Sequence, residues 1–171
     1  MKIIVGISGA SAASLGLKAY DLIPKNHEKY LVVSKRAKTV LQKEEGYDND
    51  DISAPIASGS FGSDGMLIAP CSMNTLAKIS CGIADNLLTR AAAVTIKEKR
   101  RLVLAPREMP FDPIALKNML RLSRLGAVIA PPILGYYSDR QTIEDLERFI
   151  IGRWFDLLGI ENDLYRRWGS R

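Results

Sequence analysis

Short apolar runs alternate along the chain with longer segments in which apolar residues recur at helical spacing. The runs at 2–7, 30–33, 65–69, 102–105 and 127–130 show no regular alternation with polar residues, so each predicts a strand buried on both faces. Strands that alternate with helical segments predict one α/β domain with a mostly parallel sheet. No internal repeat or linker divides the chain.

Capping residues predict where the helices begin and end. A helix over 114–125 is favoured because Asp112 can cap it, Pro113 suits its first turn and Gly126 suits its end. The other expected elements are helices over 17–23, from 35 to about 44, from 76 onward, over 86–94 and over 142–158, with polar turns or small-residue loops at 46–51 and 55–61.

Composition excludes several classes of protein. The 171 residues are 47% hydrophobic and 25% charged, as in an ordinary globular protein. The net charge of +5 comes from basic residues scattered between acidic ones, which is unlike a nucleic-acid-binding surface and suits small anionic ligands. No apolar run reaches the roughly 18 residues of a membrane span, and no signal-peptide pattern precedes the first strand. Cys71 and Cys81 make no disulfide framework or metal site, so we expect a reducing cytoplasm.

The first strand runs into a turn of small residues, 6–16, and then into a helix. This order is typical of phosphate binding, because small side chains let a ligand approach the backbone and a helix N-terminus offers free N–H groups. Ser11 stands where the dinucleotide pattern GxGxxG has glycine, and Ser34-Lys35, with no carboxylate, follows the second strand. A mononucleotide is therefore favoured. The alternative for residues 6–16 is a tight turn with close helix–strand packing. The alternative for Ser34 is a role as a helix cap alone.

Polar side chains follow two later strands. Pro106 ends one of them, and Arg107 and Glu108 come directly after it, where ligands bind in open α/β sheets. The strand at 65–69 is followed by hydroxyl and amide groups, at Ser72, Asn74 and Thr75. These groups can contact a ligand or cap a helix, and the charged pair can instead be a surface ion pair at a turn.

A few single residues carry expectations of their own. Arg90 lies among small and apolar neighbours, which predicts a buried cation that needs a carboxylate or phosphate. Cys71 at a helix N-terminus would have a lowered pKa, although we interpret it as a packing residue. His27 lies in a polar loop and leaves histidine-dependent mechanisms without their base. Tyr136-Tyr137 suit stacking on a planar ligand, and Trp168 in the polar tail suits docking on a neighbouring surface.

Taken in order, the motifs resemble those of the UbiX-type flavin prenyltransferases, in the superfamily of flavodoxin-like, homo-oligomeric, flavin-containing Cys decarboxylases. The resemblance covers residues 2–169 or so. Each motif is weak alone and the ordered set is specific: Gly9-Ala10-Ser11, Ser34-Lys35, Ala57-Ser58-Gly59-Ser60, Pro70-Cys71-Ser72, Arg90-Ala91-Ala92, Pro106-Arg107-Glu108-Met109-Pro110, Asn118-Met119-Leu120, Gly126-Ala127, Tyr136-Tyr137 and Arg167-Trp168-Gly169.

The resemblance implies a fold, an activity and an assembly. The fold is a flavodoxin-like or Rossmann-like three-layer sandwich formed by residues 1–171 as a single domain, with a tail from about residue 160 packing on a neighbouring subunit of a dodecamer. The activity is metal-independent transfer of a dimethylallyl group from dimethylallyl phosphate to N5 and C6 of reduced FMN. The product, prenylated FMN, serves UbiD-type decarboxylases in ubiquinone biosynthesis or aromatic acid decarboxylation.

The resemblance also assigns residues to roles. FMN binding is expected at Gly9, Ala10, Ser11, Ser34, Cys71, Ser72, Met73, Asn74 and Arg107. Binding of the allyl phosphate is expected at Lys97, Tyr137 and Arg153, with Arg90 and Glu44 nearby. Catalytic roles fall to Glu108 as the proton-handling carboxylate, with Ser11, Arg107 and the aromatic Trp168.

The chain departs from the family pattern at a few positions. Ala12 stands where glycine is usual, and its methyl group either crowds the flavin edge or shifts the turn. Thr89 and Ala93 stand where many members carry acids, which leaves the partner of Arg90 open, and Tyr136 replaces a common phenylalanine.

Two other functions compete with prenyl transfer. One is an FMN-dependent decarboxylase of cysteine-derived or aromatic acids. The sister enzymes that decarboxylate cysteine derivatives need a histidine near a strand end, whereas His27 precedes the second strand. The other is a non-catalytic FMN-binding protein, which would not need Arg107, Glu108, Tyr137 and Arg153 together. The sequence leaves open whether the donor is a monophosphate or a diphosphate.

Overall fold

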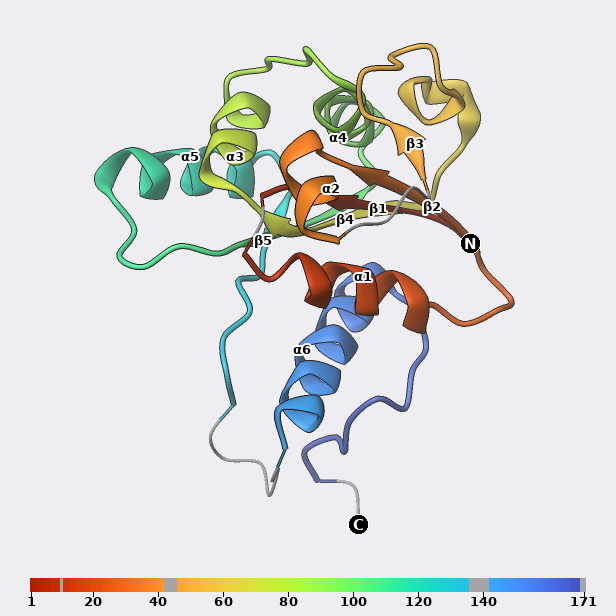
Figure 1. Ribbon diagram of the computed structural model, residues 1–171, viewed down its shortest axis with the longest axis vertical. Coiled ribbons are helices and arrows are strands. Elements are labelled where there is room, and N and C mark those ends of the chain that lie inside the picture. Colours follow the sequence, from red (N-terminus) through yellow and green to blue (C-terminus); the bar gives the residue numbers. More distant parts are fainter. Residues whose placement is uncertain (10, 42–45, 136–141, 170–171) are drawn as a thin grey trace.

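A parallel six-stranded sheet forms the centre of the computed structural model, which describes residues 1–9, 11–41, 46–135 and 142–169 (Figure 1). The strand order is β3-β2-β1-β4-β5-β6, and every pair of neighbours is parallel. The strands are β1 (Lys2–Ile7), β2 (Glu28–Val33), β3 (Tyr47–Asp48), β4 (Gly65–Cys71), β5 (Arg101–Pro106) and β6 (Val128–Ile129).

Helices cover both faces of this sheet. They are α1 (Ala13–Leu22), α2 (Lys35–Leu41), α3 (Met73–Ser80), α4 (Leu87–Lys97), α5 (Pro113–Arg124) and α6 (Ile143–Leu158), with the short 3-10 helices η1 (Pro55–Ala57) and η2 (Gly59–Phe61). In Figure 1, α1 and α6 lie below the sheet, and α3, α4 and α5 lie above it. The predicted three-layer α/β sandwich with a mostly parallel sheet is confirmed.

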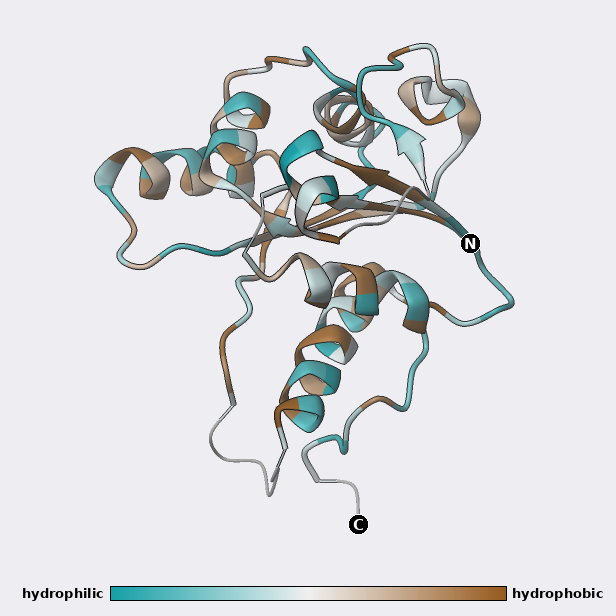
Figure 2. Cartoon of the chain, in the orientation of Figure 1, coloured by the Kyte–Doolittle hydropathy of each residue, from teal (hydrophilic) through white to brown (hydrophobic). Residues whose placement is uncertain are grey.

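The strands divide their side chains between two hydrophobic cores. In β1, Ile3 and Val5 pack with α1 and α6, whereas Ile4 packs with α3, α4 and α5. In β5, Val103 and Leu104 divide in the same way. Figure 2 shows the resulting pattern, with apolar central strands and helices that carry polar residues on one side. Both faces of the sheet are buried, and this explains why the strand sequences are continuous apolar runs without polar alternation.

Close packing of α1 depends on one glycine. A Cβ atom on Gly16 would lie 1.8 Å from the carbonyl oxygen of Ala69 in β4, so no larger residue fits without a shift of the backbone. The small-residue turn therefore also has the packing role that the sequence left as an alternative.

Capping residues define the helix ends as predicted. Asp112 accepts a hydrogen bond from the Ala115 N–H at 2.7 Å and caps α5, which starts at Pro113. Thr142 and Asp145 form a reciprocal capping box at the start of α6. In the described ranges, β3 and the two 3-10 helices replace the predicted turn and loop. No helix of the described residues is long and apolar enough to cross a membrane.

Candidate functional site

The carboxyl ends of β1, β4 and β5 meet around one hollow of about 120 Å³. It lies where the chain order reverses, because β1 leads outward to β2 and its neighbour β4 leads outward to β5. Such a switch point is the usual ligand site of an open α/β sheet. Its lining residues are Ser8, Gly9, Ser11, Pro70, Cys71, Ser72, Met73, Arg107 and Glu108.

The turn after β1 brings backbone to this hollow. Gly9 has a φ of 89°, and a Cβ atom there would lie 3.2 Å from the Cβ of Ser72. Ala12 precedes α1 with a φ of 63°, in the left-handed region, and supplies no side-chain cap. The first N–H groups of α1 are therefore not capped by the Ala12 side chain and can bind an anion, as the predicted phosphate site requires.

Two serines tie this turn to the neighbouring strands. Ser34, after β2, accepts hydrogen bonds from the N–H groups of Gly9 and Ala37, both at 3.4 Å. Ser8 is buried; its hydroxyl donates to the carbonyl of Pro70 at 3.3 Å and accepts from the Ser72 N–H at 3.0 Å. The sequence analysis missed Ser8. Its position as the first polar residue after a buried strand was the available signal.

The segment after β4 contributes both backbone and capping groups. Ser72 caps α3, since its hydroxyl accepts from the Thr75 N–H at 3.3 Å and lies 3.0 Å from the Thr75 hydroxyl. Met73 lines the hollow, whereas Asn74 is exposed and is not among the lining residues. The structure thus brings Ser72 and Met73 to the hollow and leaves Asn74 at its outside.

The expectation of a lowered pKa for Cys71 is wrong. Cys71 is the last residue of β4, pairs in register with Pro106 and is fully buried in the core. Burial raises the pKa of its thiol to about 12. Its interpretation as a packing residue is confirmed, because desolvation outweighs its place before a helix.

Arg107 and Glu108 lie exposed at the open side of the hollow, directly after β5. One carboxylate oxygen of Glu108 accepts a hydrogen bond from the N–H of Met109 at 3.0 Å. No ion pair joins Arg107 to Glu108, both of which belong to the described ranges. The alternative prediction, a surface ion pair between these two residues, is therefore wrong. Both charged residues line the hollow instead.

Arg90 is exposed, so the predicted buried cation is wrong. The buried side of α4 carries Leu87, Leu88, Ala91, Ala92, Val94 and Thr95, and Arg90 falls on the opposite side. Thr89 is buried and forms a capping box with Asn86, which gives its hydroxyl a structural role within α4. An exposed Arg90 needs no partner within its own chain.

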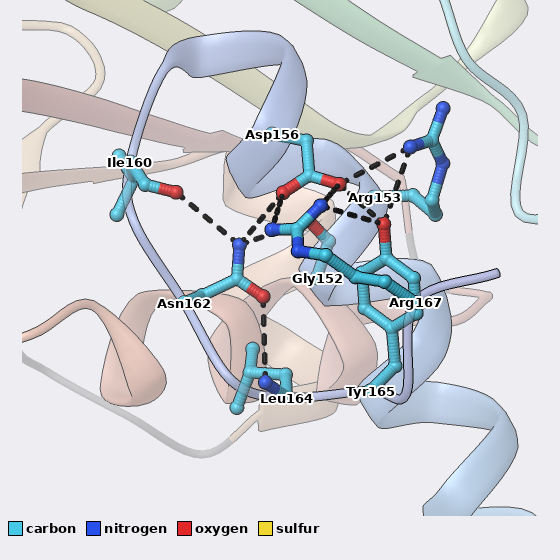
Figure 3. A network of polar contacts seen from close by, with 8 residues as sticks. All are labelled: Gly152, Arg153, Asp156, Ile160, Asn162, Leu164, Tyr165 and Arg167. Atoms are coloured by element: carbon cyan, nitrogen blue, oxygen red, sulfur yellow. Dashed lines mark hydrogen bonds and ion pairs between the residues drawn. The ribbon is translucent and has the colours of Figure 1, made fainter. Parts of the chain in front are cut away.

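The predicted cations Lys97 and Arg153 do not meet the hollow within one chain. Lys97 ends α4 just before β5 begins, at the edge where strands start, and pairs with Glu98 at 3.0 Å. Arg153 is on α6 and contacts Asp156 and Tyr165 (Figure 3). Trp168, in the tail, is 91% exposed.

Five residues that the sequence analysis discussed remain to be placed. Ala10, Glu44, Tyr136 and Tyr137 lie outside the described residues. His27 directly precedes β2, with its Nδ1 3.3 Å from the N-terminal nitrogen of Met1. This is the edge of the sheet opposite the hollow, and so the histidine has no place in the site within one chain.

Residues 1–154 match the family model described as Flavoprotein. The flavin prenyltransferase UbiX of Thermoplasma acidophilum is 45% identical over 98% of this chain and 100% of its own length. That of Helicobacter pylori strain 26695 is 45% identical over 99% of both chains.

Solved structures agree with these matches. A dodecameric FMN-dependent UbiX-like decarboxylase from Escherichia coli O157:H7 has a TM-score of 0.92 and 43% identity, with 99% of this chain and 100% of that chain covered. AnUbiX (PadA1) in complex with FMN and dimethylallyl pyrophosphate has a TM-score of 0.91 and 41% identity, with 99% and 98% covered. The FMN-binding protein AtHal3, at 23% identity and a TM-score of 0.70, shares the fold.

Proposed function

The chain belongs to the UbiX-type flavin prenyltransferases of the Flavoprotein family, and on this basis we propose that it transfers a dimethylallyl group to reduced FMN. The donor is dimethylallyl phosphate. Its allylic C–O bond breaks as that carbon bonds to flavin N5; phosphate leaves and N5 loses its proton. The double bond of the transferred group then takes up a proton and forms the second new bond to C6, which loses its own proton. Prenylated FMN, the product, then serves a UbiD-type decarboxylase.

The observation that carries this proposal is the hollow at the ends of β1, β4 and β5, with Arg107 and Glu108 at its open side. Gly9, Ser11 and the start of α1 offer backbone to a phosphate group, and Ser34 fixes that turn. We also assign FMN contacts to Ser72 and Met73, which line the hollow, and to Ala10 and Asn74, which adjoin lining residues in the sequence. Cys71 closes its floor from within the core.

Neighbouring copies of the chain complete the substrate side. The hollow of about 120 Å³ is smaller than the 300 Å³ or so that ligand pockets usually need. Lys97 and Arg90 are exposed and are not among the residues that line it, so we assign them, with Arg153, Tyr137 and Glu44, to phosphate sites built between copies. A dodecameric relative and the exposed Ile114, Leu116 and Leu120 on α5, 73%, 53% and 52% exposed, support such an assembly.

The chemistry follows from the charges around the donor. Cationic Lys97, Arg153 and Arg107 would stabilise the negative charge that develops on the departing phosphate. Trp168 and Tyr137 would place aromatic faces beside the positive allyl group. Glu108 would take the proton that C6 loses when the new ring closes, with the Ser11 hydroxyl as its helper.

The domain and the compartment belong to the same proposal. Residues 1–171 act as one flavoprotein domain, and the tail from about residue 160 carries Trp168 to a neighbouring copy. The expected compartment is the cytoplasm, where Cys71 and Cys81, both free thiols in the structure, stay reduced.

Decarboxylation is the competing activity, because several similar structures are described as decarboxylases, among them a phenylacrylic acid decarboxylase from Aquifex aeolicus that is 36% identical. His27 at the opposite edge of the sheet gives no support to a histidine-dependent mechanism in the hollow. The deciding experiment is anaerobic incubation with reduced FMN and dimethylallyl phosphate, without added metal, followed by mass spectrometry of the released flavin. A flavin heavier by one C5H8 unit supports the proposal.

The controls separate the alternatives. Dimethylallyl diphosphate replaces the monophosphate in a parallel reaction to define the donor. Unmodified FMN that remains bound with both donors contradicts prenyl transfer and favours a non-catalytic flavin-binding protein. Release of CO2 from a cysteine-derived or aromatic acid, with FMN unchanged, would instead establish a decarboxylase.

A further inference from the structure

One carboxylate joins helix α6 to the C-terminal tail. Asp156 accepts hydrogen bonds from Arg153 at 3.1 Å, from Arg167 at 2.8 and 3.2 Å and from Asn162 at 3.0 Å (Figure 3). The Tyr165 hydroxyl also donates to it. Arg153 is one turn of α6 before Asp156, whereas the other three donors come from the tail.

Apolar contacts hold the same tail segment against α6. The rings of Phe149 and Tyr165 meet edge to face with their centroids 5.2 Å apart. A Cβ atom on Gly152 would lie 2.5 Å from the Tyr165 ring, so the tail packs directly on the helix backbone there. The junction is therefore a built structure rather than a loose surface ion pair.

The arrangement leaves Arg153 able to bind an anion. Both of its described hydrogen bonds, to Asp156 and to the Tyr165 hydroxyl, use Nη1. The Arg153 side chain is 52% exposed, whereas that of Asp156 is 16% exposed. Asp156 and Tyr165 thus hold one corner of the guanidinium group, and its Nε and Nη2 donors remain for a phosphate.

Electrostatics keep Asp156 charged in this setting. Burial disfavours its ionised form, but hydrogen bonds from Arg167, Tyr165 and Asn162 outweigh burial and lower the pKa of the carboxyl. The carboxylate is therefore a permanent acceptor at neutral pH. A neutral amide at this position could accept fewer charge-assisted bonds.

We propose that Asp156 is a positioning residue, which fixes the guanidinium of Arg153 and the tail that carries Trp168 in one rigid arrangement. The donor's phosphate would meet Arg153 while its allyl group meets the tryptophan, so one carboxylate would align the two ends of the substrate. This role rests on the proposed function for its substrate, although the anchoring of the tail does not.

The test compares Asp156→Asn with Asp163→Asn. Asp163 is an exposed tail residue, so its substitution removes the same charge from the same region. For Asp156→Asn we expect a KM for dimethylallyl phosphate raised about 10-fold, which corresponds to one or two charge-assisted hydrogen bonds. The Kd for FMN should stay unchanged, because the flavin hollow is built from other elements. Asp163→Asn should match the wild type in both constants.

A second readout needs no activity. Amide hydrogen exchange in residues 160–169 should quicken in Asp156→Asn and not in Asp163→Asn. Tyr165→Phe, which removes only the hydroxyl, should give an intermediate rise in both exchange and KM. Quicker exchange with an unchanged KM, or equal behaviour of the two asparagine variants, would refute the positioning role.

The proposed function can fail separately. If the wild-type enzyme forms no prenylated FMN, the role of Asp156 toward a substrate fails with it. Quicker tail exchange in Asp156→Asn would then still show that the failure lies in the assigned reaction and not in the anchoring contact.

Discussion

The Ser34 hydroxyl accepts a hydrogen bond from the Gly9 N–H at 3.4 Å, which links the ends of β1 and β2 beside the proposed flavin site. Ser34→Ala removes this bond and the cap of α2 at Ala37. We expect about 1 kcal/mol loss of folding free energy and an FMN Kd raised about fivefold. Urea unfolding and fluorescence titration measure the two effects. Ser123→Ala, at an exposed site on α5, should change neither.

Glu108→Gln separates proton handling from structure. A glutamine oxygen can still accept the bond from the Met109 N–H, so the loop should keep its form. We expect prenylation to slow by about 100-fold or more, the range of lost acid–base catalysis, with FMN affinity within about twofold of the wild type. Single-turnover assays under anaerobic conditions measure the rate. Unchanged turnover would remove Glu108 from the mechanism, and Glu161→Gln is the control for an exposed acid elsewhere.

Ala12→Gly tests the departure from the family pattern. Ala12 has a φ of 63°, where an alanine is strained and a glycine is not. Relief of this strain should stabilise the glycine variant by about 1 kcal/mol. The conformational entropy that glycine loses on folding should offset part of this gain. Ala13→Gly, one position later and inside α1, should instead destabilise by about 1 kcal/mol. Thermal unfolding of the two variants shows whether the effects have opposite signs.

Gly16→Ala should be among the more damaging single methyl additions. Its Cβ would lie 1.8 Å from a backbone oxygen of β4, and backbone cannot move aside as a side chain can. We expect a loss of about 3 kcal/mol or more in the free energy of unfolding. Ser14→Ala, on the exposed side of the same helix, should be nearly neutral. Denaturant titrations measure the free energy of unfolding of both variants. Equal values for Gly16→Ala and Ser14→Ala would contradict the packing argument.

The two cysteines should differ sharply in reactivity. Burial raises the pKa of Cys71 to about 12, whereas Cys81 is exposed. At about pH 8, iodoacetamide should modify Cys81 and spare Cys71 in the native protein, because only the thiolate reacts and only Cys81 is reachable. Peptide mass spectrometry identifies the modified residue. Denaturation should expose both, and native Cys81→Ser should take up no label.

Strand ends and caps could be predicted because they depend on local sequence. Pro106 ends β5 and Asp112 caps α5, as expected from residue type alone. The last helix begins beside Thr142, as its predicted range had it. The convergence of Gly9, Ser72 and Arg107 could also be foreseen, since the carboxyl ends of parallel strands share one edge of the sheet.

Other features depend on contacts that sequence neighbours do not reveal. Arg90 has apolar neighbours along the chain, but helical geometry turns it away from them toward solvent. Cys71 precedes a helix, yet its register with Pro106 places it in the core. The two-residue β3 is too short to produce any periodic pattern.

The outermost strands of the sheet, β3 and β6, span two residues each. Backbone groups at a sheet edge are a template for pairing with a strand of another molecule, and this pairing starts many aggregates. Strands of two residues offer almost no template, and the part of β2 that β3 leaves unpaired, residues 28–31, begins with the charged Glu28 and Lys29. A protein that gathers many copies of itself through side-chain surfaces can therefore do so without joining their sheets into a fibre.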